Sequence, residues 1–244
     1  MSRSQPPAVG DGAPAPVVRL RDVVKSYPGG VHALQGVDLD VSRGELVAIV
    51  GPSGSGKTTL LQIMGTLDRP TSGIVEIDGY DAVAAADDEL SALRARRIGF
   101  VFQQFYLLDG LDAVGNVAGG LLYTGLAAHE RRERAREALE QVGLGNRLSH
   151  RPNELSGGER QRTAIARALV GGPAIVFADE PTGALDSATG ADIVELLQEL
   201  NREGATLVVI THDADLAATL PRQVHMRDGL VVGDTTNVGA GIGA

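Results

Sequence analysis

The chain of 244 residues has no cysteine. Disulfide bonds, thiolate catalysis and cysteine-ligated metal sites are therefore excluded. No apolar run approaches the roughly 20 residues that a helix needs to cross a bilayer. Lysine is rare as well, because only Lys25 and Lys57 among the 22 basic residues are lysines. A chain that otherwise uses arginine keeps an ammonium at these two positions, and at Lys57 a planar guanidinium is no substitute.

Basic residues are outnumbered by 31 acidic ones, which gives a net charge of −9 at pH 7. This charge argues against DNA or RNA as a sequence-independent partner, because neutralising phosphates requires a basic face. Hydrophobic content of 43% and charged content of 22% are ordinary for a globular protein. The length predicts one α/β domain with a helical insertion and a sizeable core.

Both ends of the chain differ in composition from the middle. Residues 1–16 are rich in proline, alanine, glycine and serine, and they lack the apolar segment of a signal peptide. We expect a disordered lead-in over 1–16 and a flexible tail over 235–244. The folded domain is then expected to span 17–234.

Short apolar runs and turn signals alternate between residues 17 and 46, which predicts an antiparallel β layer. Beyond this layer, strand-like and helix-like segments alternate, a pattern typical of a mostly parallel sheet covered by helices. The strands are expected at 45–50, 73–78, 98–102, 174–178 and 206–210, and the helices at 57–67, 87–97, 128–142, 156–169 and 191–201.

A glycine-rich loop joins the first buried strand to the first helix and fits the P-loop pattern G-x-x-x-x-G-K-[ST]. Its glycines let successive N–H groups point at phosphates, and the helix N-terminus adds partial positive charge. Lys57 supplies a point charge to the β- and γ-phosphates, and Thr58 a hydroxyl to Mg²⁺. A chance Gly/Ser turn is disfavoured by the flanking strand and helix. The predicted nucleotide-binding residues here are Gly51, Ser53, Gly54, Ser55, Gly56, Lys57, Thr58 and Thr59.

Two acids, Asp179 and Glu180, end the apolar run 174–178. A strand buried on both faces can carry carboxylates only at its end, where ligands bind in α/β sheets. Asp179 is placed to hold Mg²⁺, and Glu180 to polarise the attacking water. Acids also follow strands as solvated termini, so this interpretation depends on the P-loop.

The stretch 155–162, Leu-Ser-Gly-Gly-Glu-Arg-Gln-Arg, resembles the signature motif of ATP-binding-cassette (ABC) transporter subunits. Three further stretches resemble motifs of that family and follow its order: 101–105 its Q-loop, 179–186 its joined Walker B and D-loop, and 209–213 its H-switch. The resemblance covers about 17–234. It implies a P-loop NTPase core with an N-terminal antiparallel β layer and a helical subdomain at about 104–165.

The resemblance also implies roles for single residues. Tyr27 would stack on adenine, with a core aromatic as the alternative, and Gln103 would sense Mg²⁺ and water, with a solvated side chain as the alternative. His212 would contact the γ-phosphate and align the water. The remaining histidines are expected to be structural or exposed. In the D-loop, Ala184 stands where many relatives have asparagine, which puts one hydrogen bond in doubt.

The residues of the signature predict an anion-binding helix N-terminus even without the resemblance. Ser156 is a good N-cap, and Gly157 and Gly158 permit close approach of a phosphate to backbone N–H groups. One chain thus has two anion-binding helix N-termini, which cannot easily embrace one phosphate together. The resemblance implies a head-to-tail dimer in which each Mg-ATP lies between the P-loop of one copy and Ser156, Gly157 and Gly158 of the other.

The family resemblance implies an ATPase that drives an integral-membrane permease from the cytoplasmic face of the cell membrane. Stretches 67–73, 91–94 and 185–190 resemble a subgroup that serves lipoprotein release, macrolide and peptide export, and cell-division signalling. A nucleotide-gated signalling subunit of a membrane complex, without transport, is the alternative. A soluble ABC ATPase of DNA repair or translation is disfavoured, since there is no long coiled coil and only one P-loop.

Overall fold

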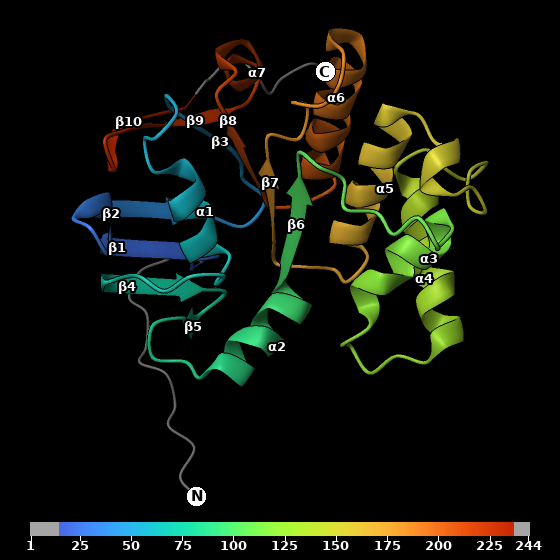
Figure 1. Ribbon diagram of the computed structural model, residues 1–244, viewed down its shortest axis with the longest axis horizontal. Helices are drawn as coiled ribbons and strands as arrows, with labels where there is room; N and C mark the ends of the chain where they lie inside the picture. The colour runs from blue at the N-terminus through green and yellow to red at the C-terminus, as the bar shows by residue number, and fades with distance from the viewer. Residues whose placement is uncertain (1–14, 237–244) are drawn as a thin grey trace, which may run out of the picture.

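The computed structural model describes residues 15–236, which form stacked layers (Figure 1). The first layer is a four-stranded antiparallel sheet in the order β2-β1-β4-β5. Its strands are β1 (Val18–Tyr27), β2 (Val31–Val41), β4 (Ser72–Ile77) and β5 (Tyr80–Asp81). The β layer predicted over 17–46 is therefore present, and β4 and β5 extend it.

The central layer is a six-stranded sheet in the order β10-β9-β3-β8-β7-β6. Its strands are parallel except β10, which pairs antiparallel with β9 at one edge. They are β3 (Leu46–Val50), β6 (Ile98–Phe102), β7 (Ile175–Asp179), β8 (Leu207–Thr211), β9 (Arg222–Arg227) and β10 (Leu230–Thr236). The mostly parallel α/β sheet predicted from the alternating pattern is confirmed.

Side chains of the central sheet alternate between two cores because successive residues of a strand face opposite sides. On β3, Val47 and Ile49 pack in the core that contains α1 and the antiparallel sheet. Leu46, Ala48 and Val50 pack in the second core with the helices on the other face. Strands β3, β7 and β8 are thus buried on both faces, and the polar residues of β7 and β8, Asp179 and Thr211, lie at the strand ends.

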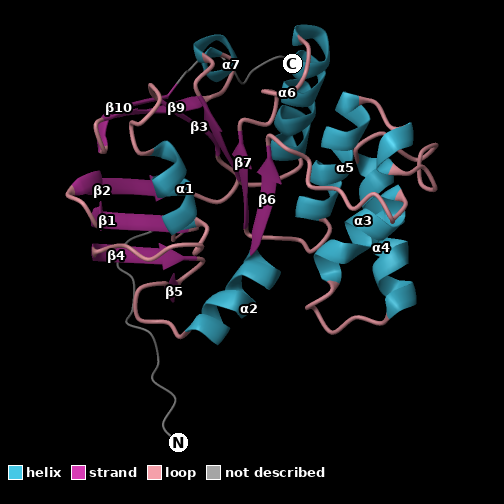
Figure 2. Ribbon diagram, in the orientation of Figure 1, coloured by secondary structure: helices cyan, strands magenta, loops and turns pink. Residues whose placement is uncertain are grey.

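The helices cover the central sheet from both sides. They are α1 (Lys57–Met64), α2 (Asp87–Arg97), α3 (Ala113–Ala118), α4 (Ala128–Gln141), α5 (Gly157–Leu169), α6 (Ser187–Arg202) and α7 (Ala214–Ala218), with 3₁₀ turns η1 (Gly119–Leu121) and η2 (Pro152–Glu154). Figure 2 shows α3, α4 and α5 grouped beyond β6 and β7, on the side away from the antiparallel sheet. Within residues 15–236, no helix is both long and apolar enough to span a membrane.

Some elements escaped the sequence analysis. The short helices α3 and α7 and the strands β5, β9 and β10 have no strong periodicity and are stabilised by their neighbours in space. The helix expected over 57–67 ends at Met64, where Gly65 caps it. Strand β10 reaches Thr236, two residues into the predicted tail, because Thr236 pairs with Arg222 of β9. The rest of that tail and residues 1–14 of the predicted lead-in lie outside the described residues.

Candidate nucleotide site and catalytic acid

The P-loop connects the end of β3 to the start of α1. Gly54 (φ 80°) and Gly56 (φ 98°) have left-handed backbones, and a Cβ on Gly56 would lie 2.4 Å from the Ala33 oxygen. Gly56 is the N-cap of α1, no side chain caps the helix, and its first turn contains no acid. The first amides of α1 therefore keep the donor capacity and positive field that an anion uses.

Lys57 is only 9% exposed, and its ammonium donates to the carbonyl oxygens of Gly51 (2.7 Å) and Pro52 (3.0 Å). Ser53 and Thr58 are exposed around it, and Thr59 is half-buried. The Ser55 carbonyl accepts from the Gly229 amide at 3.0 Å, so the turn between β9 and β10 supports the loop. The structure thus brings the predicted P-loop residues together around one cation.

Glu180 follows β7 in a left-handed conformation (φ 47°), which is costly for a residue with a side chain. Its amide donates to the Ile210 oxygen at 2.9 Å. Its carboxylate accepts from the Thr211 hydroxyl at 3.1 Å and from the His212 amide at 3.0 Å. Thr211 was not singled out from the sequence, although its place at the end of β8, beside β7, was the available signal.

The His212 side chain is 71% exposed, and its Nδ1 lies 2.6 Å from Glu180 Oε1. The hydrogen bond to Glu180 and its negative charge raise the pKa of His212 above the ordinary histidine value. The sequence predicts that His212 and Glu180 act on the same water, and the structure brings the two side chains into contact because β7 and β8 are adjacent and parallel.

The Asp179 carboxyl group is half-buried at the end of β7. Burial raises its pKa, the charge of Glu180 raises it further, and Lys57 lowers it. Lys57 thus offsets the burial of the Asp179 carboxylate only in part, and a hard divalent cation with oxygen ligands would stabilise this carboxylate further. No group of three or more His, Asp or Glu in the described residues could hold a metal, but Mg²⁺ needs only one or two carboxylates beside substrate phosphates. The donors therefore fit Mg²⁺.

Gln103 follows β6, whose residue Phe102 pairs with Asp179 of β7. The Gln103 side chain is exposed, and a Cβ added to Gly183 would lie 2.8 Å from its Nε2. Gln103 therefore lies against the turn that follows Glu180, which brings it near the acid pair.

Tyr27 is the last residue of β1 and is half-buried. Its hydroxyl donates to Asp68 at 3.0 Å, and the Lys25 ammonium lies 4.9 Å from the ring centroid. Lys25 also donates to Asp68 at 2.7 Å. The ring is thus bound to a polar group at the rim of the antiparallel sheet rather than enclosed in the core, and no sequence pattern indicated that Asp68 binds it.

Ser156 caps α5: its hydroxyl accepts from the Glu159 amide (3.2 Å), and its own amide donates to the Glu159 carboxylate (2.8 Å). This is the predicted N-cap in the form of a capping box. A Cβ on Gly157 would lie 3.1 Å from Leu185, and one on Gly158 would lie 2.6 Å from Thr189 Cγ2. Packing within the chain therefore also requires small residues here, a reason that the sequence did not reveal.

Figure 1 shows α1 and α5 on opposite sides of β6 and β7. The P-loop residues are gathered at one place and the signature residues at another. Of the predicted nucleotide contacts, Ser156, Gly157 and Gly158 are therefore the set that the fold does not bring to the P-loop.

Known proteins share this arrangement. Residues 34–183 match the family described as "ABC transporter". The uncharacterized ABC transporter ATP-binding protein YknY of Bacillus subtilis (strain 168) is 51% identical over 219 residues, covering 88% of this chain and 95% of YknY. The macrolide export ATP-binding/permease protein MacB 1/2 of Paracoccus denitrificans (strain Pd 1222) is 49% identical over 223 residues, covering 90% of this chain and 33% of MacB. The chain thus spans about a third of that relative.

A solved structure extends the likeness to the whole fold. The ATP-binding cassette MJ0796, a dimer in a post-hydrolysis state bound to ADP and Pi, has 45% identity and a TM-score of 0.79, covering 90% of this chain and 98% of that one. The resemblance to the macrolide-export subgroup is confirmed by these relatives. The chain belongs to the ABC transporter family, in which it is an ATP-binding and ATP-hydrolysing cassette.

Proposed function

We propose that two copies of this chain close head to tail around two Mg-ATP and thereby drive a conformational change in an integral-membrane permease of the export or force-transmitting type. The observation that carries the proposal is the separation of α1 and α5 across β6 and β7. The start of α1 can hold phosphate, but the start of α5 in the same copy does not reach that site, so a second copy supplies the other side of the nucleotide. The dimeric state of the related cassette MJ0796 supports this arrangement.

In this dimer the P-loop of one copy holds the triphosphate. Lys57 leaves the carbonyls of Gly51 and Pro52 for the β- and γ-phosphates, and the uncapped amides of α1 donate to phosphate oxygens. Tyr27 stacks on adenine, oriented by its hydrogen bond to Asp68. Ser156, Gly157 and Gly158 of the second copy close the other side of the same nucleotide.

Glu180 is the general base that takes a proton from the attacking water. Its hydrogen bonds from Thr211 and His212 fix the direction of its carboxylate before the water arrives. His212 donates from Nδ1 to Glu180, which leaves Nε2 for the γ-phosphate. Asp179, Thr58 and Gln103 would hold Mg²⁺, which neutralises charge on the phosphates when bound.

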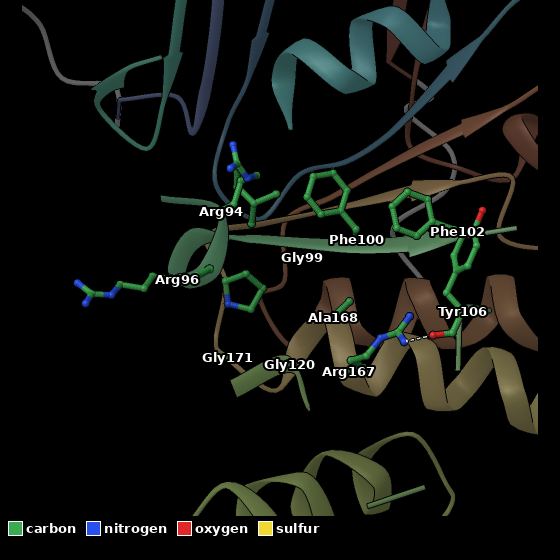
Figure 3. A pocket seen from close by; sticks show the side chains of 13 residues that line it. Arg94, Arg96, Gly99, Phe100, Phe102, Tyr106, Gly120, Arg167, Ala168 and Gly171 are labelled. Atoms are coloured by element: carbon green, nitrogen blue, oxygen red, sulfur yellow. Dashed lines mark hydrogen bonds between the residues drawn. The ribbon is translucent and has the colours of Figure 1, made fainter. Parts of the chain in front are cut away.

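A cavity of about 360 Å³ lies between the end of α2, β6 and the C-terminal end of α5 (Figure 3). One wall is aromatic: Phe100 and Phe102 stack at 5.7 Å, and Phe102 meets Tyr106 edge-on at 5.5 Å. Tyr106 is 62% exposed and Leu108 63% exposed. We place a cytoplasmic helix of the permease in this groove. Tyr106 of the groove follows Gln103 by three residues, so a movement of the permease helix reaches the catalytic turn.

The name of MacB supports this partner, because an ATP-binding/permease protein joins both functions in one chain of about three times this length. A cassette bound to the inward ends of permease helices lies on the cytoplasmic face of the membrane. The negative net charge of the chain, −9, agrees with the expectation of no nucleic-acid partner.

The replacement Glu180→Gln tests the proposal, because it keeps the shape of the side chain and removes the base. We expect ATP hydrolysis to fall by about 10²–10⁴-fold and an ATP-bound dimer to accumulate, measured by light scattering after size exclusion. The control is Glu137→Gln on the exposed face of α4, which should behave as the unchanged chain. The proposal fails if Glu180→Gln hydrolyses ATP at the normal rate, or stays monomeric with ATP in the presence of the permease.

A further inference from the structure

Gln161 is a buried amide that belongs to no motif role assigned so far. It lies on the second turn of α5 and has an exposed fraction of 0%. Its Nε2 donates to the Pro181 oxygen at 2.7 Å, whereas its Oε1 is buried without a partner in the described part of the chain. A buried acceptor without a donor costs stability, so stability alone explains this amide poorly.

Pro181 directly follows Glu180, so the hydrogen bond from Gln161 acts on the backbone next to the catalytic acid. The left-handed Glu180 persists only if its surroundings fix it on all sides. Its amide is held by Ile210, and its carbonyl accepts from the Gly183 amide at 3.0 Å. Pro181 has a fixed φ, so the rotation that orients its carbonyl group is the freedom that remains at this residue. The hydrogen bond from Gln161 fixes the direction of that carbonyl.

The same helix start is packed on the segment that continues from Pro181. Gly157 lies against Leu185, and Gly158 lies against Thr189. Gln161 stands about one turn further along α5 and reaches back to the beginning of that segment. The first two turns of α5 therefore contact the segment from Pro181 to Thr189 at three points.

We propose that Gln161 is a positioning residue that holds the Glu180 turn in its left-handed, hydrolytically competent form. Because the start of α5 contacts the other copy's nucleotide in the proposed dimer, and this part rests on that proposal, Gln161 also links closure on one ATP to the base at the second site. Gln161 is fully buried and acts through the Pro181 carbonyl.

The test is Gln161→Met, which keeps the length and helix preference of the side chain and removes the donor. We expect kcat to fall by about 10- to 100-fold, because the base is misplaced. The KM for ATP and the Kd for ADP should change by less than about threefold, because the P-loop is untouched. The control is Gln198→Met on α6, which removes a similar hydrogen bond from amide to carbonyl, to Thr219 (3.1 Å), away from Glu180.

A merely structural role predicts a different result, in which ADP affinity and the thermal midpoint fall together with kcat. That result, or an unchanged kcat, overturns the inference. If Gln161→Met does not fold, Gln161→Asn serves in its place, since it keeps the amide but is too short to reach Pro181. The double variant with Glu180→Gln should still dimerise with ATP. Failure of Glu180→Gln alone to dimerise refutes the proposed function, whereas a normal kcat in Gln161→Met refutes only the positioning role.

Discussion

The starts of α1 and α5 contain the same residue types, glycine and serine, but they are completed in opposite ways. Gly56 begins α1 with a left-handed backbone, no side-chain cap and the cation Lys57 behind it. Ser156 begins α5 with a full capping box to Glu159, and Arg147 donates to Glu159 at 2.7 Å. The amide of Ser156 and then Arg147 lower the pKa of Glu159, so an ionised acid stands at this helix start.

A glycine-rich helix start is therefore not a phosphate site by itself. The start of α1 has open amides and a cation, and it can hold an anion alone. At the start of α5, part of the amides are already hydrogen-bonded and a carboxylate is present. This helix start can therefore complete only a phosphate site that already contains a cation, such as the P-loop with Lys57. Because the start of α1 is open and cationic and that of α5 is capped and acidic, we expect nucleotide to bind first to the P-loop and then to recruit the second copy.

The largest expected effect distinguishes the two helix starts by their affinity for ADP. Lys57→Met removes a buried cation that faces the phosphates, which should cost about 3–5 kcal/mol, or about 10²–10⁴-fold in Kd. Ser156→Ala should leave ADP affinity unchanged in the single chain and abolish ATP-driven dimerisation in the Glu180→Gln background. Calorimetric titration with ADP measures the first effect. Equal losses in the two variants would refute the difference between the helix starts.

A smaller effect concerns the fit of each glycine. Gly158→Ala places a methyl group against Thr189 Cγ2 and should cost about 1–3 kcal/mol in the free energy of unfolding by urea. Adding Thr189→Ser removes that methyl and keeps the hydroxyl that donates to Asp186 at 2.7 Å, so most of the loss should be recovered. No such rescue exists for Gly56→Ala, whose new methyl meets a backbone oxygen of Ala33. A double variant as unstable as Gly158→Ala alone would show that Thr189 is not the obstacle.

The smallest effect is a change in the pKa of His212, measured by NMR titration, which reports the electric field of each helix start at this side chain. Glu180 raises this pKa and Lys57 lowers it. Glu180→Gln should therefore lower the pKa, Lys57→Met should raise it, and Ser156→Ala should leave it unchanged. Since the folded-state pKa is raised, the stabilising pair with Glu180 is fully present below the ordinary histidine pKa and is lost as the pH rises through the raised value. A fall in Lys57→Met would contradict the assignment.

Local signals were sufficient for part of the site. The P-loop could be predicted because its chemistry depends on consecutive residues between a buried strand and a helix. The meeting of Glu180 with His212 could be predicted because the carboxyl ends of adjacent parallel strands share one sheet edge. The left-handed backbone of Glu180 and the bond from Gln161 to Pro181 could not, since both depend on how α5 packs against the turn after β7.

The two helix starts, the buried strands and the acids at their ends are encoded locally, because each follows from hydrophobic period, glycine placement and capping chemistry within a few residues. Long-range packing places α1 and α5 on opposite sides of β6 and β7 and Gly158 against Thr189. The physical reason is that these contacts join residues far apart in the chain, and their geometry is set by the packing of two cores on one twisted sheet.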